Sequence, residues 1–420
     1  MNGVSGNVWR FVPKPDRANA GMWAIAAGHA MTHAYSAAFY LLLPFLARDL
    51  GLTYSQVGLI ISMRQLVSTA VNLPAGVIVD TLGRRGLLMG LSLAWAAVPY
   101  LVVGLTSSYT VILVAVSLVG IGGFLWHPAA ITAISEMYPT RRGYGLALHE
   151  LGANLGEALT PLAAGLLLVA LNWRSVLLLI VALGLLLTLS VVGMMYRRHG
   201  WRVAPSVRSP SVRDYAKGLG VLVRNARLLV LTLVSGVRAM TQLGLSTFLP
   251  LYLSNELHVP APLLGLYLAV VQASGMIATP IAGTLSDRLG PKRVATAGML
   301  TTSVVVFGFA ALHLGAAFVA GLALLGFFVY SMRPAIFRWA IGMVPRQYEG
   351  AAVGLLFTSQ ALLPAAMPII GGFLADRYGL LSVFYMIAGT VLVANLALLF
   401  VPDVRRPPEV TQLEGRQAAD

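Results

Sequence analysis

Long apolar runs recur along almost the whole chain, and each is long enough for a helix to cross the hydrocarbon core of a bilayer, which takes about 20 residues. We count twelve such runs, at residues 20–47, 54–79, 86–106, 109–136, 143–169, 174–196, 228–253, 262–285, 293–312, 315–344, 350–374 and 380–402. The first run is too long for the hydrophobic region of a signal peptide, so we expect it to remain as a span. The pattern predicts an all-α polytopic membrane protein with twelve transmembrane helices.

One long polar stretch interrupts this pattern at about residues 198–227, and it carries basic residues from Arg198 to Arg224. Because six spans lie on either side of it, we expect it to link two six-helix halves. The predicted organisation is a cytoplasmic N-terminal segment at 1–19, an N-terminal six-helix bundle at 20–197, a cytoplasmic linker at 198–227, a C-terminal six-helix bundle at 228–402 and a cytoplasmic tail at 403–420.

Basic residues give the expected topology. Of the 29 Lys and Arg residues, 22 fall in the termini, the linker and the even-to-odd connections, and only Arg48, Arg174 and Arg377 fall on the other side. Lys and Arg resist translocation and stay in the cytoplasm. We therefore expect both termini to be cytoplasmic in a cell membrane of the bacterial inner-membrane type. Most of the net charge of +14 then reports topology.

Composition excludes several classes of protein. The chain is 58% hydrophobic and only 10% charged, and its mean hydropathy is +0.80, so soluble enzymes and nucleic-acid-binding proteins are excluded. The absence of cysteine excludes disulfides, thiolate metal sites and a cysteine nucleophile. No zinc motif, nucleophile elbow, cofactor fingerprint or P-loop occurs. We expect a protein that is not an enzyme, holds no cofactor and is not driven by ATP.

A short motif is repeated between the spans. It reads Gly76-Val-Ile-Val-Asp80-Thr-Leu-Gly83-Arg84-Arg85 after the second span and Gly283-Thr-Leu-Ser-Asp287-Arg288-Leu-Gly290 after the eighth, 207 residues later. A fainter copy, from Gly372 through Asp376 to Gly379, closes the eleventh span. Internal repeats of this kind are typical of transporters built from two halves that rock about a site near the membrane midplane.

These motifs resemble the signature of the major facilitator superfamily, and the resemblance covers about residues 20–402. It implies two pseudo-symmetric six-helix bundles that work by alternating access, usually as a monomer. Thr81 stands where the family commonly carries Arg. The resemblance also implies that the motif residues form a gate, namely Gly76, Asp80, Gly83, Arg84, Arg85, Gly283, Asp287, Arg288 and Gly290.

Ionisable residues at membrane depth are costly and usually line a cavity or a proton path. Spans 3, 6, 9 and 12 have no acidic residue or Arg in their interiors, which suits helices that face lipid. In span 1, His29 and His33 are four residues apart and share one face, and in span 4 His127 precedes Pro128 at an expected kink. We expect these histidines to face the cavity and bind substrate. Neutral packing histidines are the main alternative; a metal site is less favoured, because no carboxylate completes a motif in the same helix.

Span 5 carries the carboxylates that lie deepest in the membrane. Glu150, Asn154 and Glu157 form one polar stripe, and His149 lies beside Glu150. A carboxylate removed from water can hold a proton at physiological pH. We expect Glu150, Glu157 and His149 to couple transport to protons. The alternative is a structural role in which the carboxylates pair with Arg64 or bond to neighbouring helices.

Arginines at membrane depth point to the charge of the substrate. Arg64, Arg238 and Arg333 lie in spans 2, 7 and 10, and Gln242 extends the donor face of span 7. They outnumber the deep carboxylates, so at least one guanidinium lacks an obvious counter-charge. Because Arg keeps its charge and offers a planar fork, an anionic substrate would supply that partner. Arg338 lies nearer the cytoplasmic end of span 10, where a gate or snorkelling role is expected.

The sequence from Gly120 through His127-Pro128 to Gly145, His149, Gly152 and Gly156 resembles the fosmidomycin-resistance branch of the superfamily, as does Gly28-His29 through Pro44. Fosmidomycin is a phosphonate, so this resemblance implies proton-driven efflux of a small organic anion. Proton-coupled uptake of an organic anion is the first alternative, and a non-transporting membrane receptor or scaffold is the second. The expected partners are a small anion, protons and the lipid bilayer.

Overall fold

The computed structural model describes residues 20–82, 85–199, 220, 222–309, 314–345 and 348–403. Twelve long helices account for most of these residues, as the apolar pattern predicted. They are α1 (Ala20–Leu50), α2 (Tyr54–Leu82), α3 (Arg85–Leu105), α4 (Tyr109–Met137), α5 (Arg142–Leu167), α6 (Trp173–His199), α8 (Ala226–Asn255), α9 (Ala261–Leu289), α10 (Pro291–Gly308), α11 (Ala316–Gly342), α12 (Glu349–Tyr378) and α13 (Leu380–Leu399). Within the described residues, nine helices are long and apolar enough to cross a membrane on their own.

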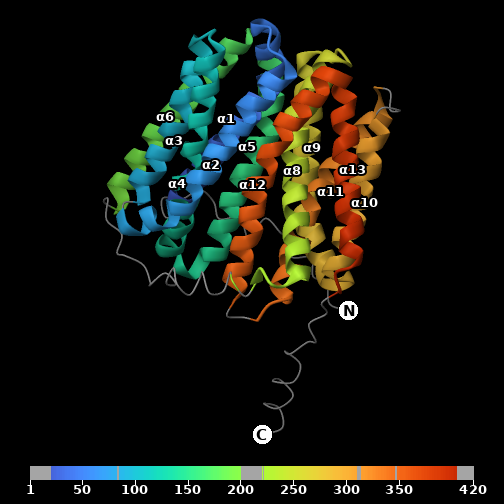
Figure 1. Cartoon of the computed structure of the whole chain (residues 1–420). Coiled ribbons are helices and arrows are strands. Elements are labelled where there is room, and N and C mark those ends of the chain that lie inside the picture. Colours follow the sequence, from blue (N-terminus) through green and yellow to red (C-terminus); the bar gives the residue numbers. More distant parts are fainter. Residues whose placement is uncertain are drawn as a thin grey trace, which may run out of the picture.

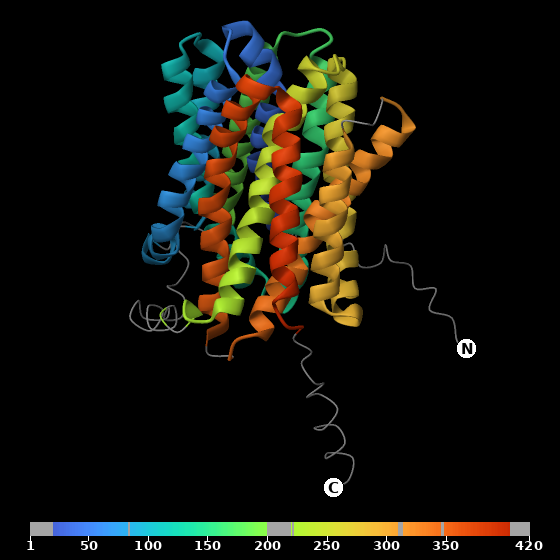
Figure 2. The same cartoon turned by 45° about the vertical axis from the view of Figure 1, so that its right-hand side comes forward.

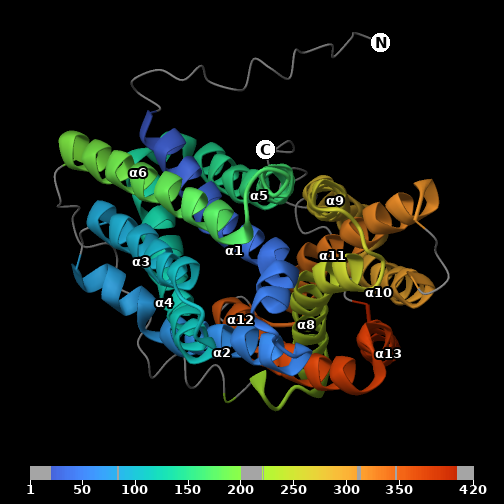
Figure 3. The same ribbon diagram turned by 90° about the horizontal axis from the view of Figure 1, so that it is seen from above.

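The helices form two bundles of six. Figure 3 shows α1–α6 in one group and α8–α13 in the other, and in Figure 1 the long helices of both groups run roughly parallel to a common direction. The bundles meet where α2 packs along α12 and α5 packs along α9, with α1 and α8 also in contact. The expected fold, two six-helix bundles, is confirmed. Most of the expected linker and both terminal segments lie outside the described residues.

The helices α3, α6, α10 and α13 lie at the outside of the two bundles (Figure 2 and Figure 3). They correspond to the spans that have no acidic residue or Arg in their interiors, and large apolar side chains on them are exposed. In lipid such side chains are at no disadvantage, because the acyl chains are as apolar as they are. Examples are Leu183, Leu186 and Leu189 on α6, Val304 and Phe307 on α10, and Val393 and Leu396 on α13.

Small residues let the bundles come close. A side chain on Gly58 of α2 would collide with the carbonyl of Pro368 on α12, and one on Gly372 of α12 would collide with the backbone of Tyr54 and Ser55. Glycine at these places allows two helix backbones to touch. The end of the molecule at which α1 begins and α13 ends is called the terminal end. The other end, at which α1 ends and α2 begins, is called the opposite end. The contacts between α2 and α12 described here belong to the opposite end.

Candidate functional site

Four of the seven histidines lie together inside the N-terminal bundle. His29 and His33 come from α1, His127 from α4 and His149 from α5. The His29 ring stacks on that of His149 with centroids 3.7 Å apart, and it lies 4.8 Å from His33 and 5.0 Å from His127. We call these four residues the histidine cluster. The sequence analysis divided them between substrate binding and proton coupling; the structure places them in one site.

Close packing of three helices positions this cluster. Gly152 and Gly156 lie directly on the backbone of α1, where any side chain would meet the carbonyls of Ala26 and Ala30. The indole of Trp126 fills the space beside Gly28 and donates from Nε1 to His149 Nε2 at 3.2 Å. These close contacts hold α1, α4 and α5 together around the rings. The span-5 glycines, Gly152 and Gly156, therefore have a packing role.

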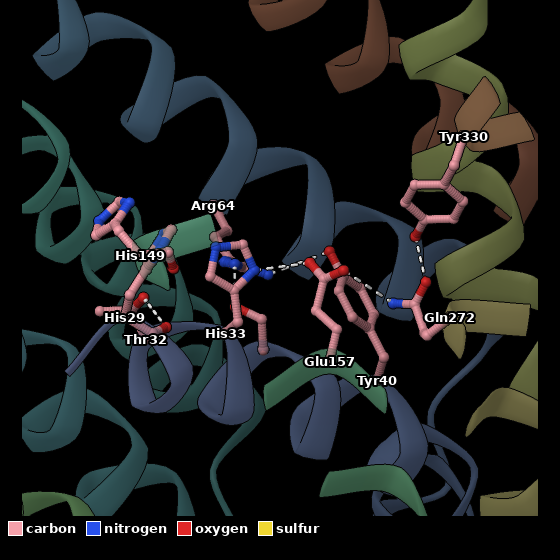
Figure 4. Close-up of polar contacts among 10 residues, drawn as sticks. His29, Thr32, His33, Tyr40, Arg64, His149, Glu157, Gln272 and Tyr330 are labelled. Atoms are coloured by element: carbon pink, nitrogen blue, oxygen red, sulfur yellow. Dashed lines mark hydrogen bonds and ion pairs between the residues drawn. The ribbon is translucent and has the colours of Figure 1, made fainter. Parts of the chain in front are cut away.

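Glu157 connects the cluster to the other bundle (Figure 4). One oxygen of its carboxylate accepts from His33 Nδ1 at 2.7 Å, and the other accepts from Gln272 Nε2 of α9 at 3.4 Å. Tyr330 of α11 donates its hydroxyl to Gln272 Oε1. Glu150, by contrast, has a side chain that is 69% exposed and lies 3.8 Å from His149. The carboxylates expected to act together thus have different surroundings.

Arg238 of α8 is buried, with 4% of its surface exposed. Its two terminal nitrogens donate to Gln242 Oε1 at 3.0 Å and Gln360 Oε1 at 3.3 Å. Gln360 is itself oriented by a bond from its Nε2 to Ser235 Oγ at 2.8 Å. Arg238 Nε is buried and has no hydrogen-bond partner among the described residues. The hydrogen bonds of this cation are thus to neutral amides.

Arg64 and Arg333 have different environments. Arg64 Nη2 donates to Ser36 Oγ at 2.7 Å and Nη1 donates to Tyr40 OH at 3.1 Å, so its hydrogen bonds are to neutral groups of α1 (Figure 4). Among the described residues, no ion pair or hydrogen bond joins Arg64 to Glu150 or Glu157, the carboxylates of span 5 with which it was expected to pair in the alternative interpretation. Arg333 is exposed and lies over the rings of Phe337 and Phe357, at 5.8 and 5.9 Å from their centroids.

A small cavity of about 50 Å³ lies between the two bundles. Tyr40 contributes to it from α1, and Gln242, Gln272 and Tyr330 contribute from the C-terminal bundle. Its remaining lining is largely apolar, which is the usual composition of a small-molecule site. The sequence analysis missed Gln272, Tyr330 and Gln360. Neutral polar residues are common in membrane helices, and only their position at the meeting of the bundles distinguishes these three.

The first gate motif is only partly described. Gly83 and Arg84 lie outside the described residues, and Gly76 and Asp80 belong to a stretch of α2 whose side chains are not described. Arg85 is buried and forms an ion pair with Glu136 of α4 at 3.1 Å. This pair ties the start of α3 to the last turn of α4 inside the N-terminal bundle.

The second gate motif forms a contact within the C-terminal bundle. Asp287 near the end of α9 pairs with Arg338 of α11. Gly290 adopts a left-handed backbone, with φ of 90°, between α9 and α10. Gly283 lies in α9 at a position where a side chain would meet open space, and Arg288 is exposed. Arg338, expected at a gate or as a snorkelling residue, is thus in contact with the motif.

We expect the Asp287–Arg338 pair to make a small contribution to stability, because both side chains are about half exposed or more. Exposed ion pairs contribute about 0.2–1 kcal/mol. A double-mutant cycle with Asp287→Asn and Arg338→Gln, measured by thermal unfolding, should give a coupling energy in this range. Arg288→Gln in place of Arg338→Gln is the matched control. A coupling above about 2 kcal/mol would contradict the assignment as an exposed pair.

The third copy of the motif reaches across the bundles at the opposite end. Asp376 of α12 accepts from the backbone nitrogens of Tyr54 and Ser55, at 2.8 and 2.9 Å, and from Ser55 Oγ at 2.5 Å. Nearby, Arg48 Nη2 donates to Asn255 Oδ1 at 3.3 Å, and Asn255 Nδ2 donates to Tyr54 OH at 3.3 Å. The two bundles are therefore fastened together at this end.

Comparison with known proteins agrees with this architecture. A family model described as Major Facilitator Superfamily matches residues 25–315 and 231–419. The chain is 27% identical over 380 residues to the probable sulfoacetate transporter SauU of Cupriavidus necator, covering 85% of this chain and 87% of that protein. It is 23% identical over 394 residues to the fosmidomycin resistance protein of Escherichia coli, covering 91% and 92%.

A solved structure with the same fold is that of a bacterial homologue of the human lysosomal transporter Spinster, in an inward-facing and occupied conformation. It superposes with a TM-score of 0.77 over 93% of this chain and 97% of that chain, at 16% identity. At this identity the likeness concerns the fold alone.

Proposed function

The chain belongs to the major facilitator superfamily and is a multi-pass membrane transporter, and we propose that it exports a small organic anion by alternating access, driven by the proton gradient. The family assignment rests on a family model that matches most of the chain. Substrate, direction and driving ion are the proposed part.

The main support for an anionic substrate comes from the burial and the hydrogen bonds of Arg238. Its guanidinium is buried, it donates to two amide oxygens, and its Nε has no partner among the described residues. A buried charge is costly unless it is paired. A carboxylate, sulfonate or phosphonate entering between the bundles would supply both the missing charge and an acceptor, because the guanidinium fork matches these groups.

Other features support the same substrate class. Arg333, an exposed cation of α11 in the same bundle as Arg238, adds to the positive charge of the C-terminal half. The relatives named for sulfoacetate and for fosmidomycin resistance support a small anion as cargo. The resistance protein and the resemblance in spans 1, 4 and 5 support export and a proton gradient as the driving force.

The conformation is proposed to be inward-facing. The positive-inside rule supports a cytoplasmic location for the terminal end. The bundles are fastened at the opposite end by Asp376, Arg48 and Asn255. His127 and Glu150, nearer the terminal end, are exposed. A carrier closed outside and accessible inside has this arrangement.

Transport into proteoliposomes tests the proposal. A panel of small carboxylates, sulfonates and phosphonates is offered with and without an imposed proton gradient, and neutral and cationic drugs serve as comparison. Exchange moves protons and anions in opposite directions, so we expect anions to accumulate inside the vesicles when protons flow out of them. Accumulation of anions when protons flow into the vesicles would favour symport. Movement of neutral or cationic compounds with no movement of anions would contradict the substrate class.

A further inference from the structure

We propose that the histidine cluster binds a divalent transition-metal ion, with His29, His33 and His127 as its ligands. One ligand atom from each of these three residues can be chosen so that all lie within 4.8 Å of one another. The three side chains come from α1 and α4 in the N-terminal bundle, whereas Arg238 and the two glutamines that hold it, Gln242 and Gln360, belong to the C-terminal bundle. The proposed metal ligands are therefore different side chains from those of the proposed anion contact.

The hydrogen bonds of His29 prepare one of its nitrogens for a metal. Nδ1 lies 2.8 Å from the carbonyl oxygen of His149, which can only accept, so Nδ1 carries the hydrogen. In the neutral ring Nε2 then has a free lone pair. This atom is buried and has no hydrogen-bond partner among the described residues, in a side chain that is 1% exposed. A buried acceptor without a partner is unusual, and a metal ion would satisfy it.

His33 is prepared in the same way. Its Nδ1 lies 2.7 Å from the Glu157 carboxylate, so it is held as a donor and Nε2 is again the free nitrogen. Histidines that bind metals commonly donate their other N–H to a carboxylate or a backbone carbonyl, which fixes the ring and raises its basicity. His33 and His29 show these two arrangements side by side.

His127 completes a set of three, and its exposure leaves an open approach to the site. Around a tetrahedral ion with nitrogen ligands at about 2.0–2.1 Å, ligand atoms are about 3.3 Å apart. The ligand atoms must therefore come closer by up to about 1.5 Å from the 4.8 Å limit observed here. We expect rotation of the exposed His127 side chain to contribute to this movement. His149 does not join them, because its Nε2 accepts from Trp126.

The donor set selects the class of ion. Neutral imidazoles suit Zn²⁺, Ni²⁺, Cu²⁺ and Co²⁺, while Mg²⁺ and Ca²⁺ require oxygen ligands. The Glu157 carboxylate behind His33 offsets part of the positive charge of the ion. Three protein ligands leave a fourth position for water or an oxygen of another ligand.

Metal titration of the purified full-length protein, stripped with a chelator and held in detergent, tests this site. We expect one Zn²⁺ per chain by calorimetry, a Co²⁺ absorption spectrum of the tetrahedral type, and no displacement by Mg²⁺. His127→Ala should weaken Zn²⁺ binding at least tenfold, and its exposed position leaves the helix packing in place. Glu157→Gln should weaken it by about 10–100-fold, the usual effect of losing the carboxylate behind a histidine ligand. His258→Ala, which changes an exposed histidine outside the cluster, should have no effect.

Two outcomes would overturn the proposal. One is the absence of saturable Zn²⁺ binding at one per chain; the other is equal affinity in His127→Ala and His258→Ala. Anion binding to the metal-free protein is measured on the same samples. Absence of Zn²⁺ binding in a protein whose anion affinity still falls in Arg238→Ala would be failure of this inference alone. Zn²⁺ binding that is weakened by His127→Ala, in a protein that binds no anion, would be failure of the proposed function alone.

Discussion

Replacing Arg238 by alanine should lower the affinity for the transported anion by about tenfold or more. Removal of a charge-assisted hydrogen bond in a partly desolvated site costs about 1.5–3 kcal/mol, and every 1.4 kcal/mol corresponds to a factor of ten. Lysine should recover only part of the loss, because a point charge cannot reproduce the guanidinium fork. Arg333→Ala should have a smaller effect, since Arg333 is exposed and its charge is already screened by water.

Substrate affinity and melting temperature are measured on the same purified variants. Arg227→Ala is the matched control, because Arg227 is exposed at the start of the same helix, α8. If Arg238 only holds helices together through Gln242 and Gln360, its removal will lower the melting temperature and leave the affinity of the surviving molecules unchanged. That result would take away the main support for an anionic substrate.

The fold follows from the sequence because the bilayer restricts what a chain can do. Backbone groups in hydrocarbon must bond internally, so each long apolar run becomes a helix and the runs can simply be counted. The two copies of the motif, one around Asp80 and one around Asp287, then indicate two related halves. Helix ends were predicted less closely: α9 runs from Ala261 to Leu289, whereas the apolar run ended at residue 285.

The sequence shows which polar residues lie along the membrane helices, but not which of them meet. Ionisable residues are rare enough in apolar helices for His29, His127 and Arg238 to stand out. Which groups meet depends on helix rotation and crossing, and a single sequence does not contain this information. Arg64 bonds to Ser36 and Tyr40 of α1, not to a carboxylate, and His149 and His29 stack although they are 120 residues apart.

The sequence motif around Asp376 indicated a functional contact but did not identify its partner. Its motif was visible as a fainter copy, yet the partner of the carboxylate is the start of α2, more than 300 residues away. The first turn of a helix has backbone N–H groups without acceptors. Thr53 and Gln56 satisfy each other's backbone nitrogens at this helix start, and Asp376 satisfies those of Tyr54 and Ser55. The cap of α2 is therefore completed by the other bundle.

Replacing Asp376 by alanine should shift the carrier away from the conformation seen here. The bonds from Asp376 to α2 exist only while the bundles touch at the opposite end, so their loss destabilises that state selectively. Loss of a helix cap costs about 0.5–2 kcal/mol, and a carboxylate at a helix N-terminus contributes about 0.3–1 kcal/mol through the helix dipole. A combined loss of about 1–2 kcal/mol changes the ratio of the two conformations about 5–30-fold. Asp376→Asn keeps an acceptor but loses the charge, and it should produce a smaller shift.

The shift is measurable because the chain has no cysteine of its own. Spin labels on Ser108→Cys and Glu256→Cys, two exposed positions on different bundles at the opposite end, report the distance between the bundles there. Asp376→Ala should increase the population with the longer distance, and Asp287→Asn, which breaks a contact within one bundle, should leave this distance unchanged. An unaltered distribution in Asp376→Ala would mean that the glycine contacts between α2 and α12 hold this end closed without help from the carboxylate. A longer distance, together with faster labelling of these cysteines, would instead show that Asp376 keeps this end closed by capping the first turn of α2.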